Sequence, residues 1–169
     1  MQQNSNIRRI DELGRIVIPK DMRKKLHIRD NESLEIYIEG EEIHIKKYSA
    51  LPDIIDYIKY IVDIGSRITG NNYIVTDRDN IIASTTKELE NLALNEHLEK
   101  MVTNCNNDKN VPFDCTLEDH RITGHANIVP LIIDGDKSGL LIEYSDTNLN
   151  TEDVIKIFKS LIESRLNNY

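Results

Sequence analysis

The chain has 169 residues, 39% of them hydrophobic and 30% charged, a composition that fits a globular protein of one domain or two small ones. Its longest apolar runs are far shorter than the roughly 20 residues of a membrane-spanning helix, and residues 1–5 have no apolar signal core. These features argue against a membrane protein, predict a cytoplasmic location and favour reduced thiols at Cys105 and Cys115.

Charge is distributed unevenly along the chain. The net charge of −8 argues against nucleic-acid binding, but residues 1–29 carry eight Lys or Arg against three Asp or Glu. Residues 30–50 are acidic, and residues 51–169 hold eleven basic and twenty acidic residues. This separation predicts a basic surface that meets a polyanion and an acidic body that stays away from it.

The first thirty residues predict two short strands and a helix. The strands cover residues 7–10 and 17–18 around a turn at Leu13-Gly14, and Pro19 suits the first position of a helix that continues to about His27. Met22 and Leu26, four residues apart, are expected on its buried face.

A hairpin follows. Apolar and polar residues alternate over 34–38 and 43–45, on either side of a turn that contains Gly40, which predicts two strands with one buried face. Residues 1–50 therefore give the order β-β-α-β-β, in a segment too short to build a generous core. Its apolar strands need a partner, and we expect dimerisation.

A second domain is predicted from residue 51. A helix over 52–70 has an apolar stripe broad enough to cover its own domain and a second subunit, although a well-buried helix explains the stripe equally well. A hairpin over 73–84, a helix within 89–102, a loop over 104–110 and strands over 122–133 and 138–144 follow. Asn150 is expected to cap a last helix, whose predicted stripe is Val154, Ile157, Phe158, Leu161 and Ile162.

Residues 8–26 contain the order Asp-x-Leu-Gly-Arg-x-Val-Ile-Pro-x-x-x-Arg and resemble the DNA-binding domain of the AbrB family of bacterial transition-state regulators; the resemblance extends over 7–48. It implies a swapped-hairpin β-barrel in which two protein chains interleave their β-strands. The partner that it implies for this dimer is double-stranded DNA. The DNA-contacting residues that it implies are Arg8, Arg15 and Arg23, with Arg9 and Lys24 at further basic positions. Lysine at position 24 keeps the charge but lacks the planar fork of arginine.

The pairing with an α+β domain is similar to that of sporulation-linked members of the family, whose C-terminal part is a GAF domain. The expected fold class is α+β: a swapped-hairpin domain over 1–50, followed by a GAF-like α/β sandwich over 51–169. Such a domain holds a small-molecule pocket between its sheet and a cover, here residues 85–110, but the ligand and its contacts are not predicted. Alternatively, residues 51–169 only assemble the chains, as dimers or tetramers.

Enzyme chemistry is not expected. The sequence lacks a Ser-His-Asp order, a Walker loop and a dinucleotide fingerprint, and it predicts no cofactor. Cys105, Cys115, His120 and His125 lack the close pairs of a structural zinc site, so no metal is predicted. The alternative function is a swapped-hairpin antitoxin that binds a toxin and its own promoter. Regular helices near the C-terminus argue against its short, disordered tail.

Overall fold

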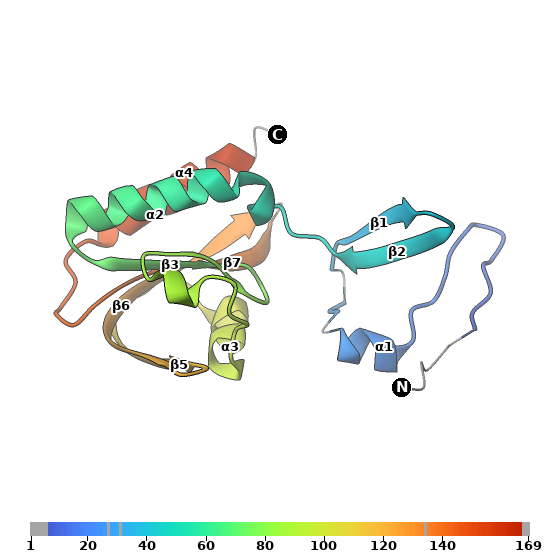
Figure 1. Ribbon diagram of the computed structural model, residues 1–169, viewed down its shortest axis with the longest axis horizontal. Coiled ribbons are helices and arrows are strands. Elements are labelled where there is room, and N and C mark those ends of the chain that lie inside the picture. The colour runs from blue at the N-terminus through green and yellow to red at the C-terminus, as the bar shows by residue number, and fades with distance from the viewer. Residues whose placement is uncertain (1–6, 27, 31, 134, 167–169) are drawn as a thin grey trace. The chain divides into compact units, whose positions relative to one another are not determined.

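The computed structural model describes residues 7–26, 28–30, 32–133 and 135–166, so the helix end predicted at His27 lies outside the described residues. The chain divides into two compact units, Met1–Tyr48 (unit 1) and Ser49–Tyr169 (unit 2). Figure 1 shows unit 1 as a loop, a short helix and a hairpin, and unit 2 as a sheet with helices on its faces. In the described part of the chain, no helix has both the length and the apolarity to cross a membrane.

Unit 1 contains α1 (Lys20–Lys25) and a hairpin of β1 (Leu34–Glu39) and β2 (Glu42–Lys47). The strands are antiparallel, with Ile36 opposite Ile45 and Ile38 opposite Ile43. Because side chains alternate between the faces of a strand, these four isoleucines share one face. The predicted hairpin is confirmed, but its apolar face is exposed in the single chain.

The predictions for residues 7–26 are partly wrong. Residues 7–19 form no strand, because a strand needs a neighbour for its hydrogen-bond ladder and the described residues of unit 1 supply none to this segment. The helix ends at Lys25, and Met22 and Leu26 are exposed rather than buried. None of the described residues of unit 1 is buried, so the single chain has no core there.

Unit 2 is built on a five-stranded antiparallel sheet in the order β4-β3-β7-β6-β5. Its strands are β3 (Asn72–Thr76), β4 (Ile81–Ser84), β5 (Asp108–Leu117), β6 (His120–Ile133) and β7 (Asp136–Ser145). Its helices are α2 (Ile55–Thr69), α3 (Glu96–Asn104) and α4 (Glu152–Leu166), with short 3-10 turns at Leu51–Ile54 and Lys87–Leu89. The sheet-and-helix character of the second domain is as expected.

Helices cover both faces of this sheet (Figure 1). On one face, Tyr73 and Val75 of β3 pack in a core with buried residues of α2 and α4. Ile74, between them, points the other way into a second core with Leu98 and Val102 of α3. The period of two along β3 thus divides the hydrophobic residues between two layers.

Helix α2 lies very close to the sheet. It ends as predicted at Gly70, which adopts the left-handed conformation with φ +73°. A Cβ at Gly65 would lie 2.7 Å from the Phe158 ring and 3.0 Å from the Tyr73 ring, so only glycine fits this seating. Ile68, which belongs to the apolar stripe of the helix predicted over 52–70, is exposed instead.

Three further expectations for unit 2 need correction. The predicted helix within 89–102 begins only at Glu96, where the Asn95 side chain caps it by accepting from the Leu98 N–H at 2.9 Å. The predicted loop over 104–110 already contains the start of β5. Helix α4 begins two residues after Asn150 and buries Ile155, Phe158 and Ile162, so part of its predicted stripe faces outward.

A buried carboxylate joins several elements of unit 2. Glu143 of β7 is fully buried and accepts hydrogen bonds from Asn71 Nδ2 (2.8 Å), the Tyr73 hydroxyl (2.7 Å) and Thr151 Oγ1 (2.6 Å) at its Oε1. Its Oε2 accepts from Asn127 Nδ2 at 2.9 Å. These bonds satisfy a charge that would otherwise be very costly to bury. The network holds the end of α2 and the start of α4 onto the sheet.

Both cysteines should be nearly inert in the folded protein. Cys105 and Cys115 are buried, and burial raises the pKa of each thiol. Because the thiolate is the reactive form, we expect iodoacetamide to alkylate both roughly a hundredfold more slowly than in urea. Mass spectrometry of tryptic peptides measures each site, and rapid alkylation of either in native buffer would contradict this packing.

Candidate nucleic-acid interface

The predicted DNA-binding residues all belong to unit 1, in two neighbouring stretches. Arg8, Arg9 and Arg15 lie in the irregular segment before Pro19 and are exposed. Arg23 and Lys24 lie on α1, the former half-buried and the latter exposed. Three of the arginines donate hydrogen bonds within unit 1, Arg15 and Arg23 to carboxylates and Arg8 to a backbone carbonyl.

Arg15 is held in a tight turn. Its main-chain N–H donates to Asp11 Oδ1 at 2.8 Å, and its Nε donates to Asp11 Oδ2 at 2.7 Å. The Leu13 N–H also donates to Asp11 Oδ1, at 3.0 Å, and Gly14 supplies the left-handed residue of the turn with φ +77°. The hydrogen bonds from the Arg15 backbone and then from its side chain lower the pKa of the Asp11 carboxyl.

The guanidinium of Arg15 nonetheless faces solvent. Its side chain is 72% exposed, and the bond to Asp11 uses Nε rather than the two terminal nitrogens. An arginine fixed at Nε can present its remaining donors to a phosphate or to a guanine edge in a defined direction. Asp11 is therefore a positioning residue for Arg15.

Arg23 is fixed by a different carboxylate. Its Nη1 donates to Asp30 Oδ1 at 2.6 Å, which joins α1 to the segment that follows it. The backbone N–H of Ile28 also donates to the Arg23 carbonyl, at 2.8 Å. Arg8 is less constrained, since its Nη1 donates to the carbonyl of the neighbouring Ile7, at 3.0 Å.

Sequence reasoning did not identify Asp11 and Asp30 as the partners of Arg15 and Arg23. The spacing Asp-x-Leu-Gly-Arg carried a usable signal for Asp11, because a carboxylate before a glycine turn commonly accepts from backbone N–H groups. Asp30 lies seven residues from Arg23 and beyond the end of α1, so the i,i+3 and i,i+4 spacings that bring side chains together on a helix do not relate the two.

The apolar face of the hairpin lies in the same unit. Ile36 is 66% exposed and Ile38 is 76% exposed, and both face the same way as Ile43 and Ile45. The opposite face is polar: Tyr37 stacks on His44 with ring centroids 5.2 Å apart, and Lys46 pairs with Glu35 at 3.0 Å. A hairpin with one polar face and one exposed apolar face needs a second layer to cover the apolar face.

No metal centre is evident among the described residues, where no three His, Cys, Asp or Glu side chains gather closely enough to hold an ion. Cys105 and Cys115 instead belong to the core beneath α3. Cys115 accepts a hydrogen bond from Asn95 Nδ2 at 3.4 Å, and the Cys105 thiol donates to the Ile128 carbonyl at 3.5 Å.

The chain is similar to several known proteins, and the matches include unit 1. Residues 7–53 match the family model of antidote-toxin recognition MazE, a bacterial antitoxin. The transition state regulatory protein AbrB of Bacillus subtilis (strain 168) is 32% identical over 95 residues, which cover 54% of this chain and 97% of AbrB. The chain belongs to the AbrB family.

Two further AbrB-family relatives come from the same organism. Stage V sporulation protein T is 38% identical over 104 residues, which cover 59% of this chain and 58% of that protein. The putative transition state regulator Abh is 45% identical over 42 residues, or 25% of this chain and 46% of Abh. The chain thus matches little more than half of Stage V sporulation protein T, and that match is longer than unit 1, so it includes part of unit 2.

Proposed function

We propose that this protein is a sequence-selective, DNA-binding transcription regulator linked to sporulation. The observation that carries the proposal is the combination, in unit 1, of an exposed arginine held in a defined turn and an apolar hairpin face without a core of its own. The names of two relatives, a transition state regulatory protein and a sporulation protein, support it.

Dimerisation through unit 1 would complete its fold. A second copy can cover the face of Ile36, Ile38, Ile43 and Ile45 with the same face of its own, and residues 7–10 and 17–18 would then gain strands to pair with. Two chains would present two copies of Arg15 and Arg23. A symmetric pair of cationic surfaces suits the repeating phosphates of a DNA duplex.

Binding would draw on phosphate neutralisation and on groove shape. Among the described residues of unit 1, the only helix is the six-residue α1, which is too short to read many bases as a recognition helix does. We infer that Arg8, Arg9, Arg15, Arg23 and Lys24 contact phosphates and base edges. Selectivity would then come partly from the sequence-dependent deformability of the duplex.

Unit 2 would assemble the dimers and respond to a ligand. On the outer side of α4, Ile157 is 57% exposed and lines, with Leu161, a shallow groove of about 410 Å³. Tyr60 and Ile68 of the neighbouring α2 are exposed as well. These apolar side chains support pairing of unit 2 with a second copy, which would join dimers into a tetramer.

The antitoxin alternative has the support of the MazE family model. That match ends at residue 53, whereas the remaining chain folds into a sheet with two hydrophobic cores. A tail that wraps a toxin gains its order on binding and would not carry such a core. A folded unit 2 therefore favours the regulator.

Loss of Arg15 or Arg23 should weaken DNA binding and leave the fold intact. Both are exposed or half-buried in unit 1, so Arg15→Ala or Arg23→Ala should reduce affinity about tenfold or more. The slope of log K against log salt should become shallower by about 0.9 for each phosphate that the variant no longer neutralises. Fluorescence anisotropy titrations at several salt concentrations, with thermal melts, measure both effects.

The matched control is Arg121→Ala. Arg121 is an exposed arginine of unit 2 whose Nη2 pairs with Asp114 at 2.8 Å, much as Arg15 pairs with Asp11. The Arg121→Ala variant removes one positive charge, as Arg15→Ala does, but from unit 2. Its DNA affinity and salt slope should therefore stay near those of the unaltered protein. Equal losses for Arg121→Ala and Arg15→Ala, or no loss for either unit 1 variant, would contradict the proposed interface.

A further inference from the structure

Unit 2 has a pocket beside the first turns of α2. It has a volume of about 460 Å³, within the range of roughly 300–1,000 Å³ usual for small-molecule sites. Pro52, Ile55 and Lys59 form one wall, and Asp77, Asn80, Ile81, Ile82 and Asn91 form the other. Ile55 and Ile82 pack against the core beneath α2 and α4, so the pocket lies on that side of the sheet.

The pocket lies only partly where the sequence predicted one: Asn91 belongs to the expected cover, but the other lining residues come from α2 and the turn before it, from β4 and from the β3–β4 turn. The cover expected over residues 85–110 packs its buried apolar side chains, Leu89, Leu94 and Leu98 among them, into the second core. The pocket lies instead next to edge strand β4 and to the start of α2. Pro52 lies four residues after Tyr48, the last residue of unit 1, so the pocket wall is close in the chain to the junction of the two units.

Polar groups with unused hydrogen-bonding capacity line the pocket. Asp77 Oδ1 accepts from the backbone N–H groups of Asp79 (2.8 Å) and Asn80 (2.7 Å). Within the described part of the chain, Asp77 Oδ2 and the side-chain amides of Asn80 and Asn91 have no hydrogen-bond partner. Asn91 adopts the left-handed conformation with φ +68°, and its N–H donates to the Ile81 carbonyl at 2.8 Å.

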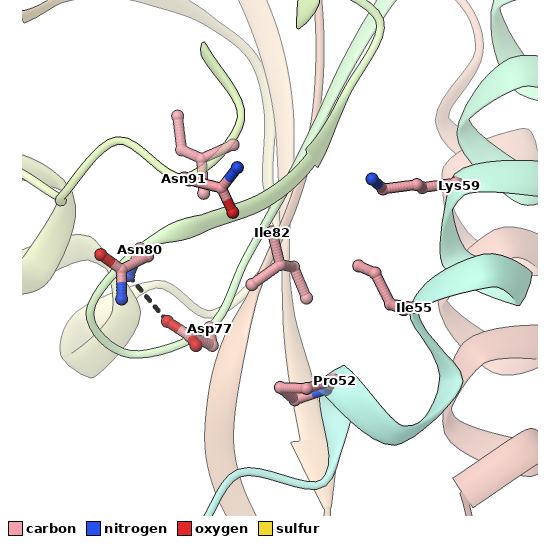
Figure 2. A pocket seen from close by; sticks show the side chains of 8 residues that line it. Pro52, Ile55, Lys59, Asp77, Asn80, Ile82 and Asn91 are labelled. Carbon is pink, nitrogen blue, oxygen red and sulfur yellow. Dashed lines mark hydrogen bonds between the residues drawn. The ribbon is translucent and has the colours of Figure 1, made fainter.

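One end of the pocket is cationic. Lys59 Nζ lies 3.0 Å from Glu90 Oε2, and Lys87 Nζ lies 3.1 Å from Glu90 Oε1. One carboxylate therefore pairs with two ammonium groups, and the trio carries a net charge of +1; of these three residues, Lys59 is the one that lines the pocket. Figure 2 shows the Lys59 ammonium and the Asn91 amide facing each other across the pocket, with Ile55 and Ile82 below them.

We propose that this pocket binds a small aliphatic carboxylate, whose anionic group lies between Lys59 and Asn91 and whose hydrocarbon body lies against Ile55, Ile82 and Pro52. An ammonium and an amide N–H are suitable donors to a carboxylate, and the isoleucines remove the aliphatic part from water. Asp77 Oδ2 and the Asn80 amide remain for a hydroxyl or amino group on a larger ligand. The proposal names the ligand class of the ligand-responsive unit 2 proposed above, and it rests on that function.

The probe is 4-methylpentanoate, titrated into the full chain and followed by two-dimensional NMR of the backbone amides. We expect saturable shifts at residues 52–59 and 77–91, with a dissociation constant on the order of 1 mM for so small a ligand. Acetate has the carboxylate but lacks the branched hydrocarbon chain, and 4-methylpentan-1-ol has the chain but lacks the carboxylate. Both should bind at least tenfold more weakly. Equal shifts with all three compounds, or no saturable shift with 4-methylpentanoate, would overturn the proposal.

Two variants locate the anionic end. Asn91→Asp places a negative charge opposite Lys59 at an exposed position where aspartate tolerates the backbone conformation, so binding should weaken at least tenfold with the fold unchanged. Lys59→Met should do the same. Its matched control, Lys100→Met, removes a lysine that pairs with Glu96 on the remote α3 and should bind normally. Normal binding by Asn91→Asp would overturn the assignment.

The same samples test ligand responsiveness separately from ligand binding. DNA titrations with and without 4-methylpentanoate at ten times its dissociation constant should differ by fivefold or more if the ligand prefers one arrangement of the chains. Saturable binding with unchanged DNA affinity would keep the site and reject ligand responsiveness. Absence of binding would reject the site, and the Arg15 and Arg23 variants would still test DNA binding independently.

Discussion

A protein with lysine in place of Ile36 should no longer form dimers through unit 1. Ile36 lies opposite Ile45 on the apolar face of the hairpin and is mostly exposed in one chain. If a second copy covers that face, each dimer must bury two unpaired ammonium groups, which costs several kcal/mol. We expect the dissociation constant of the dimer to rise at least a hundredfold, equivalent to about 2.7 kcal/mol.

Sedimentation velocity over a wide concentration range measures this change, and circular dichroism reports whether the hairpin survives without its partner. The control is Tyr37→Lys, one residue along the same strand but on the polar face. It should sediment like the unaltered protein. In a protein that used unit 1 as a monomer, Ile36→Lys would only improve solubility, and a sedimentation profile equal to that of Tyr37→Lys would exclude the interleaved dimer.

Replacement of Glu143 by alanine should destabilise unit 2 by about 3–5 kcal/mol, a large part of the usual stability of a domain. The variant leaves the side chains of Asn71, Tyr73, Asn127 and Thr151 without the acceptor that they share. Glutamine restores the volume but not the chemistry. Its amide N–H groups would face donors, and Asn127 is not free to turn, because its Oδ1 accepts from the Asn110 N–H at 2.9 Å.

Hydrogen exchange of the β6 and β7 amides, followed by mass spectrometry, measures the loss within unit 2 itself. Glu143→Gln should recover only part of the protection. The control, Glu96→Ala, removes an exposed carboxylate that pairs with Lys100 on α3 and should leave β6 and β7 unaffected. Full protection in Glu143→Gln would mean that shape, and not the charged acceptor, is what the network requires.

The sequence predicts elements well where one pattern dominates. The hairpin of β1 and β2 follows from alternation, the β3–β4 pair from two short apolar runs around a polar turn, and the end of α2 from Gly70. No strand was predicted over 108–117, a run of alternating apolar and polar residues that contains Pro112. Proline is tolerated there because β5 is an edge strand, which depends on a sheet order that no local pattern contains.

Helix α4 illustrates a second limit. Val154, Ile155, Ile157 and Phe158 offer two overlapping apolar stripes at helical spacing, and the sheet selects the one that contains Ile155. The face therefore depends on tertiary packing. In the same way, the apolar face of the unit 1 hairpin has no covering layer in one copy, and residues 7–10 and 17–18 form no strand there because they have no strand to pair with.

At the candidate DNA-binding site, the sequence indicated the arginines but not the aspartates that hydrogen-bond to them. The AbrB-like run indicated Arg15 and Arg23, but their partners Asp11 and Asp30 emerge only from the structure. The pocket was predicted only in part: Asn91 lies within the expected cover, but Lys59 and Asp77 come from other elements. The Glu143 network was missed for the same reason, because Asn71 and Glu143 are 72 residues apart.

The close seating of α2 on the sheet constrains the order in which this protein can change during evolution. Any side chain at Gly65 meets the Phe158 ring first and the Tyr73 ring next. A lineage that acquires alanine at position 65 is therefore helped by a smaller residue at 158, since otherwise the Phe158 ring has to shift. The smaller residue leaves a void that the alanine then fills, so each substitution is harmful alone and tolerated together. Substitutions in α2 and α4 are thus coupled at positions 65 and 158, although Gly65 and Phe158 lie at opposite ends of unit 2 in the sequence.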